Sequence, residues 1–188
     1  MSSGFPAEPA VPLALTTARL TLVPFTTADL DAVHALWTDA DMRKFLCDDT
    51  LVPIEQSREW LEGSSREFAA RRFGLWGVHD RADGTRIGFC GCREWPTGEP
   101  ELMYGLLRPW WGRGLATESA TAVLDYVFET LGHPVVMAAT DPPNVASLRV
   151  MERLGMAFHE RCEMQGLDTL VYRLSRERWR RVRARTSD

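Results

Sequence analysis

The residues with the clearest chemical potential are two glycines, Gly112 and Gly114, which flank Arg113 directly before a helix-like segment. The first N–H groups of a helix have no intrahelical partner, and the aligned peptide dipoles place partial positive charge there. Glycine lets a bulky ligand approach these groups, and Arg113 adds charge. The pattern predicts a phosphate-type anion site on the backbone of residues 113–117. The alternative is a strand-to-helix turn that binds nothing.

A helix after this turn is supported by apolar residues at helical spacing, whereas Glu118 and Asp125 fall on another face. The apolar positions are Ala116, Ala120, Val123, Leu124, Val127 and Phe128. The rival motif, the dinucleotide fingerprint G-x-G-x-x-G, fails because Thr117 stands where its third glycine belongs. A proline and two tryptophans also separate the preceding strand from the glycines, so a dinucleotide fold is disfavoured.

Composition restricts the classes of protein and partner. The chain has 188 residues, 45% of them hydrophobic, which predicts one globular domain with a real core. Its formal charge of −4 argues against a nucleic-acid binder and is compatible with cationic substrates. The four cysteines lack CxxC spacing and nearby histidine pairs, so no metal site is expected.

The N-terminal segment lacks a basic region and is interrupted by three prolines, so it is neither a signal peptide nor a membrane span. We expect a flexible tail over residues 1–14, a single domain over residues 15–188, a cytoplasmic location and no membrane contact. The basic C-terminal segment 176–188 is expected to be a solvated charged end rather than a helix.

Between these ends, strand-like and helix-like segments alternate, which indicates an α/β domain. Strands are predicted at 19–25, 73–80, 85–95, 101–107, 134–140, 156–164 and 168–174, and helices at 26–39, at 54–70, after Gly114 and at 144–155. Asp83-Gly84 predicts a hairpin between the second and third strands. Cys90 and Cys92 flank Gly91 in the third strand, so both are expected to pack on one face.

Four motifs, in this order, resemble the GNAT superfamily of acetyl-CoA-dependent N-acetyltransferases. They are TTARLTLVPFTTADL, GFCG, ELMYGLLRPWWGRGLATES and NVASLRVMERLGM. Within that superfamily they are similar to the Rim-type branch, which acetylates ribosomal-protein N-termini, and the resemblance covers about residues 16–175. It implies a mixed, mostly antiparallel sheet of about seven strands, flanked by helices and splayed between the fourth strand (101–107) and the fifth (134–140).

The resemblance also implies coenzyme A as the ligand of the glycine turn. The family pattern Gln/Arg-x-x-Gly-x-Gly/Ala falls on residues 111–116. Its first position holds Trp111 instead of Gln or Arg, which suits the Rim-type branch. The backbone at Leu106 and Leu107 is implied to pair with the pantetheine arm, and Asn144 matches an asparagine that contacts that arm. The pyrophosphate is implied to lie on Gly112, Arg113, Gly114, Leu115, Ala116 and Thr117.

Acetylation of an amine requires a neutral nitrogen, a donor for the developing oxyanion, and help for the leaving thiolate. By the resemblance, Glu101 lines up with a glutamate that acts as general base, and by strand parity it shares a face with Leu107. The alternative is a solvent-facing strand carboxylate. Glu94 and Asp141 are weaker candidates for the base.

The acid is harder to identify, because many GNAT enzymes place a tyrosine where this chain has Met151, four residues before Gly155, and Met156 replaces the following phenylalanine. Methionine cannot donate a proton. Ser147 matches a serine of Rim-type enzymes and is the candidate, with a contact to the cofactor sulfur. Alternatively it is a first-turn helix serine bonded to backbone, and the thiolate leaves unassisted.

Three hypotheses follow. The first is an N-acetyltransferase that moves the acetyl group of acetyl-CoA, without a metal, to a primary amine by direct attack in a ternary complex. The acceptor would be a small molecule or a protein N-terminus, bound by the helices of residues 26–70 and by residues 165–169, and a homodimer is possible for such a fold. The second is a catalytically silent acyl-CoA-binding or regulatory module, and the third is an unrelated nucleotide-binding domain.

Overall fold

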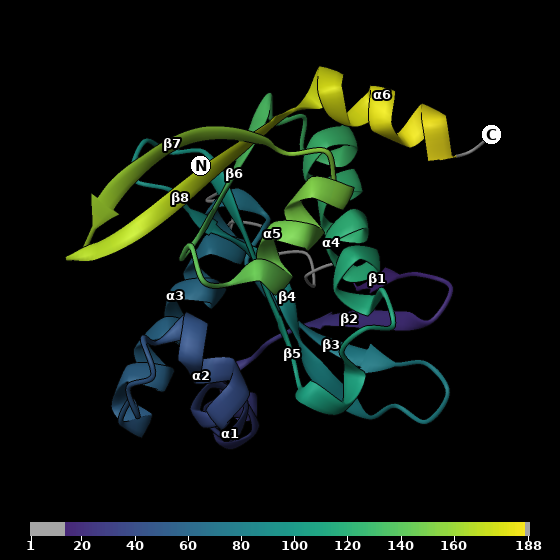
Figure 1. Ribbon diagram of the computed structural model, residues 1–188. Helices are drawn as coiled ribbons and strands as arrows, with labels where there is room; N and C mark the ends of the chain where they lie inside the picture. Colours follow the sequence, from purple (N-terminus) through teal and green to yellow (C-terminus); the bar gives the residue numbers. More distant parts are fainter. Residues whose placement is uncertain (1–13, 187–188) are drawn as a thin grey trace, which may run out of the picture.

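The computed structural model describes residues 14–186, which form one eight-stranded sheet in the order β1-β2-β3-β4-β5-β6-β8-β7 (Figure 1). The prediction of a flexible tail falls almost wholly outside the described residues. All neighbouring strands are antiparallel except β5 and β6. The strands are β1 Leu15–Thr16, β2 Leu20–Pro24, β3 Leu75–Asp80, β4 Arg86–Glu94, β5 Pro100–Leu106, β6 Val135–Thr140, β7 Ala157–Met164 and β8 Leu167–Ser175.

Helices cover both faces of this sheet (Figure 1). They are α1 Leu30–Thr38, α2 Ala40–Leu46, α3 Ile54–Arg71, α4 Leu115–Asp125, α5 Val145–Arg153 and α6 Arg176–Thr186, with a π-turn at Tyr126–Thr130 after α4. The largest core cluster joins α4 and α5 to one face, and a second cluster joins α1 to the other. The expected α/β GNAT-type sheet, flanked by helices, is therefore confirmed.

Strand β5 lies at the centre of this arrangement, and its side chains alternate between the two clusters. The even-numbered Leu102 and Leu106 are buried in the cluster with α4. The odd-numbered Met103 and Leu107 pack in the cluster with α1. Glu101 is odd-numbered, so it shares the face of Leu107, as predicted.

The sheet opens between β5 and β6, the predicted fourth and fifth strands. Their parallel pairing is limited to Glu101 opposite Met137, so the strands separate beyond Glu101. Leu107 donates its N–H to the Ile87 carbonyl of β4 (2.8 Å). Backbone groups of alternate strand residues point to opposite sides, so those of Leu106 face the gap between β5 and β6.

The seven predicted strands are all present, and two short elements were not predicted. β1 has only two residues. Helix α2 begins after Asp39, whose carboxylate accepts hydrogen bonds from the N–H groups of Asp41 and Met42. The helix has only seven residues, so its apolar Met42, Phe45 and Leu46 give too short a pattern to predict it.

The expectation for the basic C-terminal segment is wrong, because residues Arg176–Thr186 form helix α6. Trp179 is only 2% exposed and belongs to the main core. Its indole Nε1 donates to Asp125 Oδ1 at the end of α4 (2.9 Å). Val182 packs on the same core, and Arg180 pairs with Glu129, so apolar and ionic contacts together dock a helix whose residues are mostly charged.

Two local predictions are confirmed. Strands β3 and β4 form a hairpin whose loop carries Gly84 at φ 76°. Cys90 and Cys92 are fully buried and lie in the same cluster, as small packing residues.

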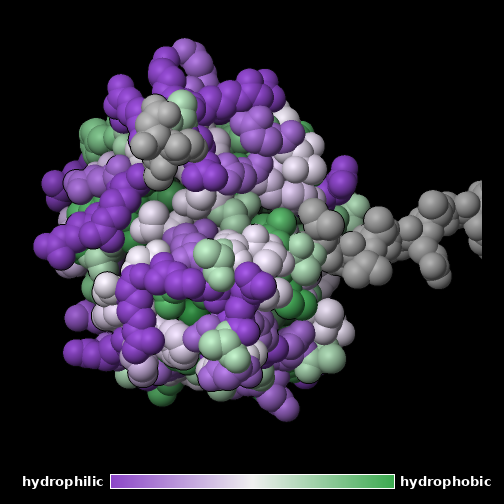
Figure 2. Space-filling view, turned by 90° about the vertical axis from the view of Figure 1, so that its right-hand side faces the viewer, coloured by the Kyte–Doolittle hydropathy of each residue, from purple (hydrophilic) through white to green (hydrophobic). Residues whose placement is uncertain are grey.

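The surface carries mainly polar side chains. Figure 2 shows one face on which hydrophilic residues predominate and apolar ones form small separate patches. Within residues 14–186, no helix combines the length and the apolar character that crossing a membrane requires.

Candidate active site

The glycine turn lies at the start of α4 and has the conformation that only glycine adopts readily. Gly112 and Gly114 both have φ 75°, and Gly114 is the N-cap of α4. A Cβ at Gly112 would meet no atom within 4 Å, and one at Gly114 would meet only an Arg19 nitrogen, at 3.8 Å. The backbone here is therefore open to solvent and accessible to a ligand.

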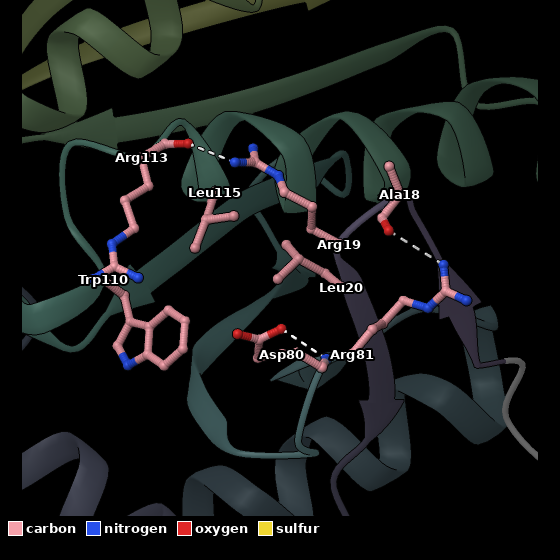
Figure 3. Close-up of a pocket in the computed structure, with 9 residues that line it drawn as sticks. Ala18, Arg19, Leu20, Asp80, Arg81, Trp110, Arg113 and Leu115 are labelled. Carbon is pink, nitrogen blue, oxygen red and sulfur yellow. Dashed lines mark hydrogen bonds between the residues drawn. The ribbon is translucent and has the colours of Figure 1, made fainter.

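Arg19, the residue just before strand β2, fixes this turn. Its guanidinium donates to the Arg113 carbonyl (3.0 Å; Figure 3) and pairs with Glu118 of α4 (2.5 Å). Burial alone would raise the pKa of Glu118, but hydrogen bonds from Thr17 and Arg19 and the charge of Arg19 outweigh it and lower that pKa. The turn is thus held in place without using the N–H groups of the first helical turn.

The two tryptophans before the glycines have structural tasks. Trp111 donates its indole N–H to the Leu106 carbonyl, and Trp110 lies under the Arg113 guanidinium, 5.0 Å from its ring centroid. The Leu107 carbonyl accepts from the Trp110 N–H (2.9 Å), so both backbone groups of Leu107 are engaged within the protein. Two residues, Leu106 and Leu107, were predicted to pair with the pantetheine arm. Of these, only Leu106 has an N–H that faces the gap.

On the other side of the gap, Asn144 and Ser147 begin helix α5. The Asn144 side-chain oxygen accepts from the Ser147 N–H (3.1 Å), as an N-cap residue does. Ser147 Oγ lies 2.9 Å from the Tyr104 hydroxyl of β5, which is also 3.2 Å from the Ser147 carbonyl. The Ser147 hydroxyl is thus bonded to another side chain, which differs from the alternative of a serine bonded only to backbone.

Tyr104 was not predicted as a site residue. Burial raises the pKa of its hydroxyl well above the usual value, although the hydrogen bond with Ser147 acts in the opposite direction. The group therefore stays protonated near neutral pH and is available as a donor. The signal in the sequence is a tyrosine three residues after Glu101, on the opposite face of the same strand.

Glu101 is 4% exposed, so the alternative of a solvent-facing carboxylate is wrong. It forms an ion pair with Arg93, the residue directly opposite on β4. This pairing offsets the cost of burying a charge. Glu101 lies where β5 and β6 begin to separate, so the residue marks the closed end of the gap.

The remaining candidates lie elsewhere. Met151 is 1% exposed in the main core, so this position offers no polar group to the gap. Glu94 pairs with Arg71. Asp141 follows β6, and burial together with the charges of Asp48 and Asp168 raises its pKa. Among residues 14–186, no group of three or more potential metal ligands is present.

A family comparison identifies the fold that carries this site. The model of the acetyltransferase (GNAT) domain matches residues 19–157, well over half of the chain. The chain belongs to the GNAT acetyltransferase family. It is 32% identical to YkkB of Bacillus subtilis (strain 168) over 120 residues, 62% of this chain and 70% of YkkB. It is 29% identical to the N-acetyltransferase p20 of Bacillus licheniformis over 145 residues, 74% of this chain and 80% of p20.

Solved structures agree with this GNAT assignment. An acetyltransferase from Agrobacterium tumefaciens str. C58 superposes with a TM-score of 0.77 at 26% identity, over 91% of this chain and 99% of the other. RimL, a ribosomal L7/L12 alpha-N-protein acetyltransferase in complex with coenzyme A, gives 0.74 at 14% identity, over 87% and 98%. The RimL likeness shows the shared fold alone.

As a GNAT acetyltransferase, this protein is an acyltransferase enzyme. Among the described strands, the sheet opens at one place, between β5 and β6. This opening is bordered by the glycine turn, the Leu106 backbone, Asn144 and Ser147. Glu101 lies at the inner end of that opening, on the opposite face of β5 from Tyr104.

Proposed function

We propose that this GNAT enzyme transfers the acetyl group of acetyl-CoA to a primary amine, by direct attack of the amine within a ternary complex. The observation that carries the proposal is the exposed pair Gly112 and Gly114 at the N-terminus of α4, beside the gap between β5 and β6. At such a site, backbone N–H groups can bind an anion, and the extended pantetheine arm of the cofactor can enter the sheet.

Coenzyme A would lie along this opening. The N–H groups of residues 113–117 would bind its pyrophosphate, since the helix dipole and the free donors both favour an anion. The pantetheine arm would pair with the Leu106 N–H, which faces the gap. The Asn144 side-chain NH₂ would donate to the same arm, because only the Asn144 oxygen is engaged in capping α5.

In this proposal Glu101 accepts the proton of the acceptor amine through a water molecule. Its carboxylate is bound to Arg93, so direct contact with a bulky amine would require breaking that ion pair. A water molecule would bridge the carboxylate and the nitrogen in this arrangement. The neutral amine then attacks the thioester carbonyl, and the carbon–sulfur bond breaks with its electron pair leaving on the sulfur. The proton that the nitrogen loses as the amide forms passes to the thiolate or to water.

Ser147 would donate a proton or a hydrogen bond to the departing thiolate. The Tyr104 hydroxyl, which stays protonated, can donate to Ser147 Oγ and so leave the serine proton free to point at the sulfur. Strand parity places Glu101 and Tyr104 on opposite faces of β5. The base and the acid would therefore approach the reacting centre from different sides.

The acceptor would be a cationic amine, either a peptide N-terminus or a small molecule. The formal net charge of −4 is compatible with a positively charged acceptor. The resemblance of the motifs to the Rim-type branch supports a protein N-terminus as one acceptor class.

A panel assay tests the proposal. Release of free coenzyme A from acetyl-CoA is measured with N-terminal peptides, polyamines and aminoglycosides as acceptors. Turnover that depends on one amine class supports the proposal. Tight cofactor binding without turnover on any amine would favour the silent acyl-CoA-binding module instead. Preference for a dinucleotide over acetyl-CoA would contradict both.

A further inference from the structure

Glu101 has different neighbours on its two sides in the sheet. The residue opposite it on β4 is Arg93, and the residue opposite it on β6 is Met137. Residues directly opposite one another in neighbouring strands project to the same face, so these two side chains flank that of Glu101. Met137 is uncharged and 6% exposed. The charge that stands directly opposite Glu101 therefore comes from the β4 side.

Arg93 binds one oxygen of the Glu101 carboxylate. Its Nε donates to Glu101 Oε2 at 2.5 Å, and Glu101 Oε1 accepts no hydrogen bond from residues 14–186. The Arg93 side chain is 53% exposed, whereas that of Glu101 is buried. The pair thus links a buried carboxylate to a solvent-exposed guanidinium, and it leaves the second oxygen available to the water molecule of the proposed mechanism.

A second carboxylate lies close to the same arginine. Glu67, near the end of α3, accepts from the backbone N–H of Glu94, the residue that follows Arg93 (2.8 Å). Burial raises the pKa of Glu67, whereas the charges of Arg93 and Arg71 act in the opposite direction. Arg93 therefore interacts with two carboxylates, one at the closed end of the gap and one on α3.

The other titratable groups around this pair come from four elements or their ends. They are Arg71 of α3, Cys92 and Glu94 of β4, Glu99 just before β5, and Arg173 of β8. Arg71 pairs with Glu94, and Arg173 lies one strand beyond Glu101, opposite Met137. Burial raises the pKa of the Cys92 thiol well above its usual value, so this group stays neutral. Within residues 14–186, Arg93 is thus the charged group that contacts Glu101.

We propose that Arg93 is a positioning residue for Glu101, and that Glu67 weakens its effect by sharing the same guanidinium. The inference rests on the proposed function, in which Glu101 receives the proton of the amine. A neighbouring positive charge favours the ionised carboxylate, which is the form that accepts a proton, and it offsets the cost of burial. The hydrogen bond at Oε2 also fixes the orientation of the carboxylate. Replacing Arg93 should therefore change both the pH range and the rate of the reaction.

The pH dependence of kcat, measured with one saturating acceptor, tests this role. Arg93→Gln should lower kcat and move the acidic limb of the profile to higher pH by roughly one unit or more, the scale on which an adjacent opposite charge acts. Arg93→Lys keeps the charge but loses the planar Nε donor, so it should restore the position of the limb and only part of the rate. Glu67→Gln keeps an oxygen for the Glu94 N–H and should move the limb to lower pH. The matched control Arg66→Gln, which removes an exposed arginine of α3 paired with Glu62, should leave the profile unchanged.

The double variant Arg93→Gln/Glu101→Gln separates positioning from a general structural effect. If Arg93 acts through Glu101, the double variant should have the kcat of Glu101→Gln alone, and additive losses would overturn the inference. An acidic limb that keeps its position in Arg93→Gln would overturn it as well. Glu67→Gln retains its acceptor oxygen, so it tests the shared arginine without loss of a contact, and a limb that fails to move to lower pH would contradict that part. A wild-type kcat in Glu101→Gln, or no turnover of any amine by the wild type, would instead contradict the proposed function itself.

Discussion

The Tyr104 hydroxyl lies 2.9 Å from Ser147 Oγ, so strand β5 and helix α5 are joined across the gap at which the sheet opens. Asn144 extends this link by capping the same helix through the Ser147 N–H. The serine is therefore oriented by contacts at its hydroxyl and at its backbone. This arrangement suits a group that must point at one atom of a bound cofactor.

Ser147→Ala should lower kcat roughly tenfold or more, as loss of a positioned proton donor does. The defect should persist at high pH, because the serine acts on the thiolate after the amine has lost its proton. Tyr104→Phe should produce a smaller defect with the same pH profile. Ser65→Ala, which removes a helix serine bonded only to the Leu61 carbonyl, is the control. Wild-type kcat in Ser147→Ala would assign the serine a purely structural role.

Glu101→Gln should reduce kcat roughly 10²-fold or more while cofactor affinity hardly changes. The loss should shrink as pH rises, because a growing fraction of the acceptor amine is then neutral without a base. A pH–rate series with a fixed acceptor measures this. Glu62→Gln, an exposed carboxylate of α3, controls for the charge change. A near wild-type kcat in Glu101→Gln would contradict the role as base, and the carboxylate would then serve only to pair with Arg93.

Gly114→Glu should abolish acetyl-CoA binding, because the new side chain places bulk and negative charge where the pyrophosphate would lie. Gly84→Glu is the matched control, since Gly84 has φ 76° and equally open surroundings but lies in the β3–β4 hairpin. Calorimetry on both variants separates backbone strain from loss of the site. Unchanged affinity in Gly114→Glu would refute the assignment of the turn.

Trp179→Ala should destabilise the protein by about 3–5 kcal/mol, the usual cost of truncating a buried tryptophan. The change removes core packing and the hydrogen bond to Asp125. Urea unfolding measures it, with Trp60→Ala as the control, because Trp60 is 38% exposed. Equal effects of the two substitutions would contradict the core role assigned to Trp179.

The Glu118 carboxylate should make the free energy of unfolding depend on pH in the acidic range. Its pKa in the folded protein lies below the usual value of 4.5. The contribution to stability is therefore present above that value and is lost as pH falls through the lowered pKa. Free energies of unfolding of the wild type and Glu118→Gln, measured between neutral and acidic pH, should converge as the pH falls. A difference that is independent of pH would contradict this role.

The sequence was most informative where a local pattern decides the structure. Gly112 and Gly114 predicted their turn because few residues other than glycine adopt positive φ at low cost. Glu101 and Leu107 were placed on one face of β5 because side chains alternate between the two faces along a strand. Seven strands followed from their alternating or apolar patterns.

The contacts missed from the sequence are those that join distant segments. Arg93 opposite Glu101 depends on the register of a hairpin, and Tyr104 beside Ser147 depends on how α5 docks on β5. The charged neighbours of Trp179 in the sequence favour a solvated end, whereas in the fold its ring lies beside Phe128 and its indole N–H bonds to Asp125. Such contacts follow from tertiary packing and leave no periodic signal in the chain.

The central claim is acetyl transfer from acetyl-CoA to an amine at the gap between β5 and β6. Mass spectrometry of an acceptor panel, after incubation with acetyl-CoA labelled in its acetyl group, tests it most directly. The account predicts that label appears on the nitrogen of one amine class in step with coenzyme A release, and that Gly114→Glu abolishes both signals. Coenzyme A release with no label on any amine, or labelling that survives in Gly114→Glu, would contradict it.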